Sequence, residues 1–139
     1  MKVLFLCTAN SCRSQMAEAF ARHYGSGIVE PYSAGTHPTR LHPMTVEVLA
    51  ERGVSTSGQR AKGLTEVPLE TELVVTVCDQ QAEACPVFPG NVRTLHWSLP
   101  DPARATGTPE EVRAAFRRVR DEIEARVRAL IDELRTGRA

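Results

Sequence analysis

A short apolar run near the start of the chain passes directly into a polar segment and then into an amphipathic one. Residues 2–6 read KVLFL, and the segment CTANSCRS that follows contains two cysteines and an arginine. Such continuous apolar runs are typical of strands buried on both faces of a parallel sheet. Residues 14–24 then place Met16 and Phe20 on one face of a predicted helix that ends at Gly25. We therefore expect a strand, a loop and a helix in this order.

The alternation of strand and helix continues along the chain. The apolar run LVVTV predicts a strand at residues 73–77, further strands are expected at residues 28–33 and 92–96, and residues 43–52 predict a second helix. Because parallel strands need crossover connections, this order favours a parallel sheet. With 139 residues, the chain is long enough for one core. We expect a single α/β domain over residues 1–139, a three-layer sandwich in which helices flank a four-stranded parallel sheet.

The last third of the chain predicts one long helix. Thr108 can cap its start, Pro109 suits its first turn, and Glu111 completes a capping box. One apolar stripe follows from the spacing of Val112, Ala115, Phe116, Val119, Ile123, Val127, Leu130, Ile131 and Leu134. The opposite face carries the i,i+4 pairs Arg118–Glu122, Glu122–Arg126, Arg120–Glu124 and Glu124–Arg128. Because the acids match the arginines, we expect that face to be solvated and self-paired.

Composition limits the function classes. Lys+Arg and Asp+Glu both number 17, so no net charge attracts nucleic acid or an anionic membrane. The apolar start is shorter than the ~7–15 residues of the apolar h-region in a signal peptide, and no run reaches the ~18 apolar residues of a membrane span. We expect a cytoplasmic protein, in which four cysteines favour catalysis or metal binding over structural disulfides.

The loop after the first strand has the features of an anion site. Parallel sheets bind ligands beyond the carboxyl ends of their strands, where residues 7–14 are expected. Inward-pointing N–H groups and the following helix N-terminus can hold an anion, which Arg13 can grip bidentately. The same donors would stabilise a thiolate at Cys7. Ser14 can donate a hydrogen bond to that sulfur or cap the helix. Asn10 is expected to brace the loop.

Several segments resemble one known family. The loop CTANSCRSQMAE, the segment SAGT at residues 33–36 and the Asp101-Pro102 pair resemble the low-molecular-weight protein tyrosine phosphatases and their relatives, the thioredoxin-coupled arsenate reductases. The likeness extends over nearly the whole chain. It implies that Cys7 is the nucleophile and that Asp101 protonates the departing oxygen. The substrate-binding residues would be Thr8, Ala9, Asn10, Ser11, Cys12, Arg13 and Ser14.

A second cysteine pair separates the two branches of this family. Cys78 and Cys85 flank the segment DQQAEA, where the arsenate reductases carry such a pair and the phosphatases do not. Ala103 stands where phosphotyrosine-specific members usually have an aromatic residue. Both features point to arsenate reduction: Cys7 attacks arsenate, Cys78 then attacks Cys7, and a Cys78–Cys85 disulfide is left for thioredoxin. We expect arsenic detoxification as the role, with phosphate and sulfate binding as arsenate analogues.

The spacing of this pair has a structural consequence. If residues 79–84 were helical, Cys78 and Cys85 would lie ~10 Å apart along the axis, whereas a disulfide needs Cα atoms within ~7 Å. We therefore expect that no regular helix persists there in the disulfide form, and that the bond becomes exposed to a reductase.

Other interpretations stay open. The main alternative is an aryl-phosphate phosphatase that uses Cys7, Arg13 and Asp101, and a non-enzymatic redox sensor or anion-binding module comes third. Cys12 can be a buried small hydrophobic residue, and Asp101 a turn residue. Zinc binding by all four cysteines is disfavoured by their spacing.

The remaining expectations concern ions and partners. Glu18 and Ser33 match positions near a monovalent cation site in some family members, and Lys62 is expected to fill that role, so we expect no metal and no cofactor. We expect a monomer that binds neither nucleic acid nor membrane. No histidine has the spacing of a paired site, and surface or strand-end positions are expected for His23, His37, His42 and His96.

Overall fold

The computed structural model describes residues 1–68, 70–79, 85, 87–88 and 91–137. Within this part of the chain each predicted strand and helix is present, and its ends differ from the prediction by at most two residues. The elements are β1 (Lys2–Cys7), α1 (Arg13–Tyr24), β2 (Glu30–Gly35), α2 (Pro43–Ala50), the 3₁₀ helix η1 (Leu64–Glu66), β3 (Leu73–Cys78), β4 (Arg93–Ser98), the 3₁₀ helix η2 (Pro102–Arg104) and α3 (Pro109–Thr136).

The described strands form one parallel sheet in the order β2-β1-β3-β4. In this register Leu6 of β1 pairs with Ala34 of β2 on one side and with Thr76 of β3 on the other. The two central strands therefore end at the same edge of the sheet. Cys7 and Cys78, the last residues of β1 and β3, lie at this edge.

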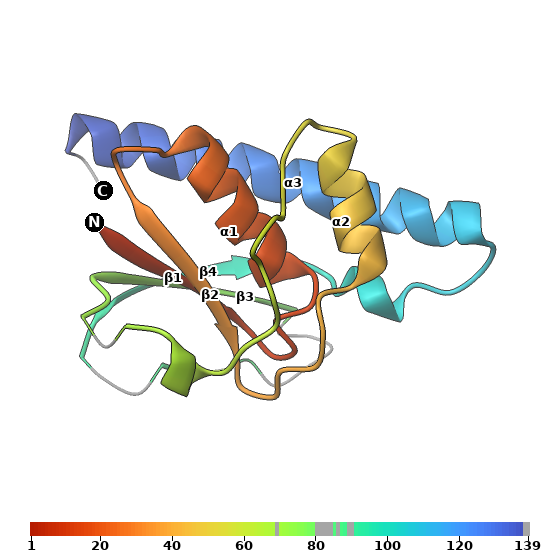
Figure 1. Cartoon of the computed structure of the whole chain (residues 1–139), viewed down its shortest axis with the longest axis horizontal. Helices are drawn as coiled ribbons and strands as arrows, with labels where there is room; N and C mark the ends of the chain where they lie inside the picture. Colours follow the sequence, from red (N-terminus) through yellow and green to blue (C-terminus); the bar gives the residue numbers. More distant parts are fainter. Residues whose placement is uncertain (69, 80–84, 86, 89–90, 138–139) are drawn as a thin grey trace.

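The two faces of the sheet are covered differently (Figure 1). Helices α1, α2 and α3 cover one face, and the core there includes Val3, Phe5, Val75, Val77, Phe20, Val48 and Phe116. The other face carries Leu4, Leu6 and Val74, which pack near Val67 and the half-buried Leu64, Phe88 and Val92. Successive strand residues alternate between the faces, as expected for a sheet buried on both sides. The α/β sandwich is confirmed, and in the described residues its third layer is η1 with irregular segments.

The start of α3 and one of its surface pairs agree with the prediction. The Thr108 hydroxyl accepts a hydrogen bond from the Glu111 N–H, and the Glu111 carboxylate accepts one from the Thr108 N–H, each at 3.2 Å. Glu122 and Arg126 form an i,i+4 ion pair at 3.2 Å. The capping box and part of the expected surface pairing are therefore confirmed.

The prediction that Arg120 and Glu124 form a solvated pair is wrong. Both residues are buried and bond to neighbouring helices or the segments that follow them. Arg120 donates to the Val48 carbonyl at 3.0 Å, and Glu124 accepts from the Tyr24 hydroxyl at 2.5 Å and from Arg52 at 2.8 Å. The apolar stripe on α3 did not reveal these contacts because α2 and α1 cover the flanks of the helix as well.

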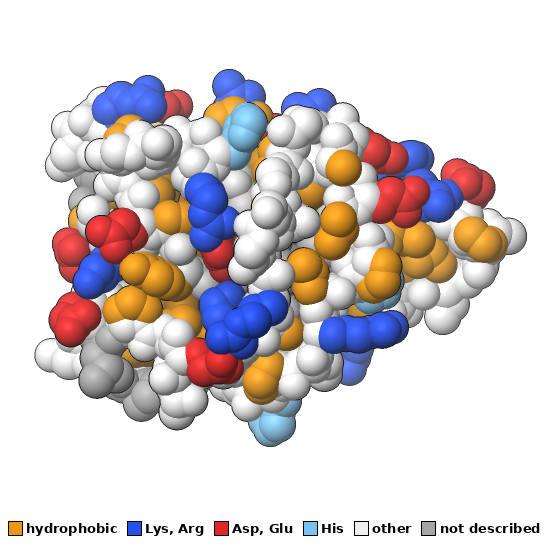
Figure 2. Space-filling view, in the orientation of Figure 1, with side chains coloured by type: hydrophobic (Ala, Val, Ile, Leu, Met, Phe, Trp, Pro, Cys, Tyr) orange, Lys and Arg blue, Asp and Glu red, His pale blue; other side chains and the backbone are white. Residues whose placement is uncertain are grey.

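The visible surface mixes charges of both signs. Figure 2 shows Lys and Arg side chains interspersed with Asp and Glu side chains over this face, which fits the balance of 17 and 17 in the sequence. Among the helices of the described residues, none is long and apolar enough to cross a membrane.

Candidate active site

The Cys7 sulfur lies in a cluster of hydrogen bonds where β1 turns into α1. The Asn10 N–H donates to Cys7 Sγ at 3.2 Å, and the Ser14 hydroxyl lies 2.8 Å from the same sulfur. Asn10 Nδ2 donates to Ser14 Oγ at 2.8 Å. Because the hydroxyl accepts that bond, its single proton is available to Cys7. Of the two roles expected for Ser14, bonding to Cys7 is therefore the one observed. The N-cap of α1 is Cys12, whose side chain makes no capping bond.

Asn10 holds the loop in shape, as expected from the sequence. Its backbone has φ 52°, in the left-handed region that asparagine tolerates better than most residues. Its side-chain oxygen accepts bonds from Gln15 Nε2 and from the Lys62 N–H, both at 2.9 Å. Lys62, which is distant in the sequence, therefore helps to hold the loop in this conformation.

Gly35 of β2 explains why the loop can pack so closely on the sheet. A Cβ atom at this position would lie 2.5 Å from the Thr8 carbonyl oxygen and 2.9 Å from the Asn10 nitrogen. Both are backbone atoms, so they cannot move aside without moving the loop. Within the SAGT segment at residues 33–36, Gly35 therefore contributes to the site because it has no side chain that would push the loop away from β2.

A pocket of about 420 Å³ opens beside Cys7. In the described residues it is lined by Cys7, Ala9, Ser11, Cys12, Arg13, Thr39, Arg40, His42, Asp101 and Ala103. Asn10 and Ser14 are not among these lining residues, and they contact Cys7 through the hydrogen bonds described above. In the part of the chain that the structure describes, the Thr8 hydroxyl is the buried side-chain group without a hydrogen-bond partner. The loop thus offers backbone and side-chain donors to an anion.

Thr39, Arg40 and His42 are pocket residues that the sequence analysis missed. They precede α2, and backbone hydrogen bonds from Thr39 to Ala9 and from His42 to Ser11 hold this segment against the loop. No local pattern predicts such pairing. Arg40 adds a second positive charge to the pocket rim.

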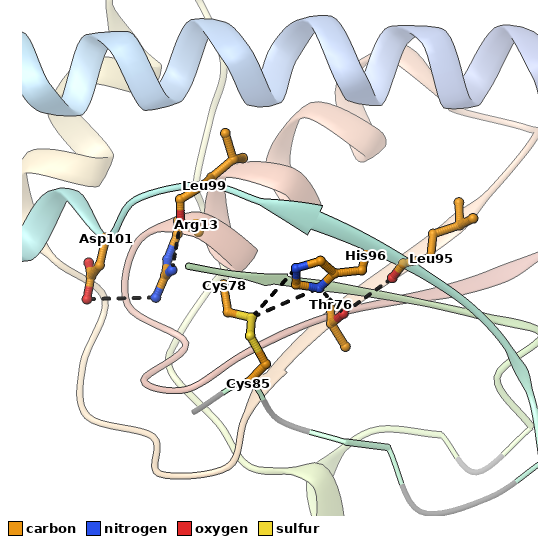
Figure 3. The surroundings of a disulfide bond; sticks show 8 residues. All are labelled: Arg13, Thr76, Cys78, Cys85, Leu95, His96, Leu99 and Asp101. Carbon is orange, nitrogen blue, oxygen red and sulfur yellow. Dashed lines mark hydrogen bonds and ion pairs between the residues drawn. A yellow bond between two sulfur atoms is a disulfide. The ribbon is translucent and has the colours of Figure 1, made fainter. Parts of the chain in front are cut away.

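Arg13 and Asp101 lie on the same side of the pocket (Figure 3). Arg13 is 3% exposed; its Nη1 donates to the Leu99 carbonyl at 3.1 Å, and its Nη2 lies 3.8 Å from Asp101 Oδ2. Asp101 Oδ1 also accepts from the Ala103 N–H at 3.0 Å. Asp101 is thus both the turn residue and the pocket carboxyl that the sequence suggested. The ion pair therefore holds the guanidinium and the carboxylate beside one another in the lining of the same pocket.

Burial favours the neutral form of two other pocket residues. Burial raises the pKa of the Cys12 thiol to about 11, which agrees with its interpretation as a small hydrophobic residue. Burial, with a contribution from Arg40, lowers the pKa of His42. The His42 ring accepts a bond from the Met44 N–H at 3.0 Å and so caps α2.

Lys62 lies at the position expected from the family resemblance. Its ammonium is 3.4 Å from Glu18 Oε1 and 3.3 Å from Ser33 Oγ, and Ser33 donates to the same carboxylate oxygen at 2.5 Å. An ammonium can neutralise this buried carboxylate, as a cation would. This charge cluster anchors α1 to β2 behind the anion loop.

Cys78 and Cys85 form a disulfide with a Cα–Cα distance of 5.8 Å. The bond is the one predicted as the end product of the cysteine relay. Of residues 79–84, whose helical conformation the disulfide is expected to exclude, residues 80–84 lie outside the described residues. By strand alternation Cys78 lies on the same face as Val74 and Thr76, away from α1.

His96 of β4 lies beside this disulfide, which the sequence analysis did not anticipate. Both ring nitrogens are 4.0 Å from Cys78 Sγ (Figure 3), and the ring also bonds to Thr76. The pairing of Thr76 with His96 in the β3–β4 register places it there. A surface or strand-end position was expected for His96; the residue is exposed and lies within β4, two residues before the strand ends.

The parallel sheet ends in a cysteine–arginine loop, and the buried thiol of Cys7 and the guanidinium of Arg13 line one pocket there. The chain matches the family described as low molecular weight phosphotyrosine protein phosphatase over residues 2–139, and it belongs to that family.

Relatives within this family carry a more specific name. The chain is 46% identical over 128 residues to an arsenate reductase of Shouchella clausii (strain KSM-K16), a match that covers 91% of each chain. A solved arsenate reductase in the phosphate binding state superposes with a TM-score of 0.77 at 30% identity, covering 96% of this chain and 98% of that one. A Corynebacterium glutamicum thioredoxin-dependent arsenate reductase gives a TM-score of 0.74 at 33% identity, covering 98% of this chain and 62% of that one.

Proposed function

We propose that this protein reduces arsenate to arsenite in the cytoplasm, with thioredoxin as its reductant, and so detoxifies arsenic. The observation that carries the proposal is the Cys78–Cys85 disulfide at the end of β3, the strand that pairs with the Cys7-bearing strand β1. A phosphatase needs the pocket around Cys7 but has no use for a second cysteine pair. The arsenate reductase names among the relatives support the same substrate.

The first step takes place in the pocket. Arsenate binds to the loop N–H groups and to Arg13, and the Cys7 thiolate attacks arsenic. Asp101 protonates the departing oxygen, which leaves as water. The proximity of Asp101 to Arg13 places the acid on the rim of the anion site. The product is a covalent Cys7–arsenic(V) adduct.

The second and third steps move two electrons to arsenic and free Cys7. The Cys78 thiolate attacks Cys7 Sγ, the sulfur–arsenic bond breaks, and arsenic leaves with the electron pair as arsenite. Cys85 then attacks Cys78 Sγ, and Cys7 departs as a thiolate. The protein is left with the Cys78–Cys85 disulfide that the structure contains. The dithiol of thioredoxin reduces this bond and closes the cycle.

One observation favours a second activity. The pocket contains Cys7, Arg13 and Asp101, and neither Cys78 nor Cys85 is among its described lining residues. An aryl phosphate could therefore be attacked at phosphorus without the cysteine pair. Ala103 stands on the pocket rim where an aromatic ring would hold a phenol, so we expect this hydrolysis to be weak.

The proposal is tested by offering arsenate and an aryl phosphate to the same preparation. Arsenate with thioredoxin, thioredoxin reductase and NADPH should give one arsenite for each NADPH oxidised, over many turnovers. The control omits thioredoxin and should stop after a single turnover. Hydrolysis of the aryl phosphate without any arsenate-dependent NADPH oxidation would contradict the proposal and favour a phosphatase.

A further inference from the structure

A cluster of metal-binding donors lies on the face of β3 that points away from α1 (Figure 3). The sulfurs of Cys78 and Cys85 and a ring nitrogen of His96 all lie within 4.8 Å of one another. Cys7 and Cys12 do not belong to this cluster, so it differs from the four-cysteine site that the spacing disfavoured. The relay proposed above uses the two thiols but gives His96 no role.

Hydrogen bonds hold the His96 ring in place. The Thr76 hydroxyl lies 3.3 Å from the Leu95 carbonyl and 2.8 Å from His96 Nδ1. When the hydroxyl donates its one proton to the carbonyl, it can accept a bond from an Nδ1–H. This tautomer leaves the lone pair on Nε2, 4.0 Å from Cys78 Sγ. Metal-binding histidines are commonly held in this way by a partner on the other ring nitrogen.

The distances suit a small thiophilic cation. In a tetrahedral zinc site with Zn–S of about 2.3 Å and Zn–N of about 2.0 Å, donor atoms lie roughly 3.5 Å apart. The separation between His96 and Cys78 is close to that value, and reduction of the disulfide frees both sulfurs to move apart. His96 is exposed and Cys85 half-buried, so an ion can enter from solvent.

We propose that the reduced protein binds one zinc ion through Cys78, Cys85 and His96, with a fourth position open to water. Both thiols lose their protons to solvent as the ion binds. The disulfide form has no thiolates and does not bind the ion. Zinc binding and disulfide formation therefore exclude one another. If the proposed reductase cycle holds, zinc keeps the pair reduced and halts the relay while the anion pocket stays intact.

The test uses a Cys7→Ser host, which removes the reactive thiol of the pocket. Reduced host protein is titrated anaerobically with Zn²⁺ against a chromophoric chelator, and with Co²⁺ for its thiolate charge-transfer band. We expect one ion per chain, and none in the oxidised host. Cys85→Ser should abolish tight binding, and His96→Ala should weaken it by about tenfold or more. The matched controls His23→Ala, at an exposed histidine, and Cys12→Ser should retain the affinity of the host.

Absence of stoichiometric binding by the reduced host would overturn the proposal. The proposal would also be overturned if both His96→Ala and His96→Gln kept the zinc affinity of the host. In that case the two thiols would bind the ion without His96. Circular dichroism of each variant shows whether it is folded. These measurements require no arsenate, so their failure leaves the proposed reductase untouched, and failure of the reductase leaves them interpretable.

Discussion

Two cysteines occupy equivalent places at the ends of neighbouring central strands, yet their surroundings differ. The Cys7 sulfur receives bonds from Asn10 and Ser14, within a loop held by further residues. The Cys78 sulfur is bonded to Cys85, and beside it lies the ring of His96. The first site is arranged to keep one geometry around a bound anion. The second is arranged to exchange bonding partners, so position in the fold alone does not decide the chemistry of a cysteine.

The largest effect should come from removing the sulfur shared by both activities. Cys7→Ser should lower arsenate reduction and aryl-phosphate hydrolysis by about three orders of magnitude or more, because a serine hydroxyl is a far weaker nucleophile. Both rates are measured on one preparation. The folded loop should persist, so phosphate should still raise the melting temperature of the variant. Substantial residual reduction would show that Cys7 is not the attacking group.

Removing Cys85 should separate arsenate reduction from aryl-phosphate hydrolysis. Cys85→Ala should release at most one arsenite per chain and then stop, because the Cys7–Cys78 disulfide can no longer be transferred. Aryl-phosphate hydrolysis should stay within about twofold of the parent, since the pocket is unchanged. Arsenite is quantified in a single-turnover assay. An equal loss of both activities would contradict the relay.

A methyl group at Gly35 should disturb the rigid site. Gly35→Ala places a Cβ 2.5 Å from the Thr8 carbonyl, so we expect a loss of about 1–3 kcal/mol in the free energy of unfolding and a fall in both activities. Urea unfolding measures the first quantity. Gly63→Ala is the matched control, because its Cβ would lie 3.8 Å from the Pro38 side chain, an ordinary van der Waals contact. If both variants behave alike, close packing of the loop on β2 is unimportant.

The anion should lose affinity when Arg13 becomes lysine. A point charge cannot reproduce the two parallel bonds of a guanidinium, so we expect Arg13→Lys to weaken phosphate binding about tenfold, or about 1.4 kcal/mol. The readout is the rise in melting temperature with phosphate at matched ionic strength. Arg40→Lys, at an exposed rim residue, should have a smaller effect. If phosphate does not change the melting temperature of the parent protein, the proposed anion site is refuted.

The smallest effect should be a local change in hydrogen exchange around the Cys78–Cys85 pair. Hydrogen exchange of the reduced protein is compared with that of the Cys78–Cys85 form. We expect faster exchange in the disulfide form, mainly within residues 78–90, because a regular helix cannot span the bonded pair. The final helix α3 contains no redox group and serves as the internal control. Equal protection of residues 78–90 in both forms would contradict this expectation.

Local patterns predicted most of the fold and the core of the site. The two central strands, β1 and β3, were visible as apolar runs, and the loop around Cys7 carries its chemistry in consecutive residues. The contacts that were missed depend on pairing between distant segments: His96 reaches Cys78 through the β3–β4 register, and Arg40 reaches the pocket because its segment bonds to the loop. The error at Arg120 has the same origin, since its partners come from the neighbouring helix.

The alternation of side chains along β3 has a kinetic consequence. By strand alternation Cys7 lies toward the helix-covered side of the sheet and the disulfide toward the other side, although both cysteines end their strands at the same edge. The oxidising half-reaction and the reducing half-reaction of the proposed cycle therefore use different surfaces. Phosphate should compete with arsenate and raise its apparent KM, yet leave the rate at which thioredoxin reduces the disulfide unchanged. An enzyme of this design can be regenerated while a competing anion still occupies its pocket.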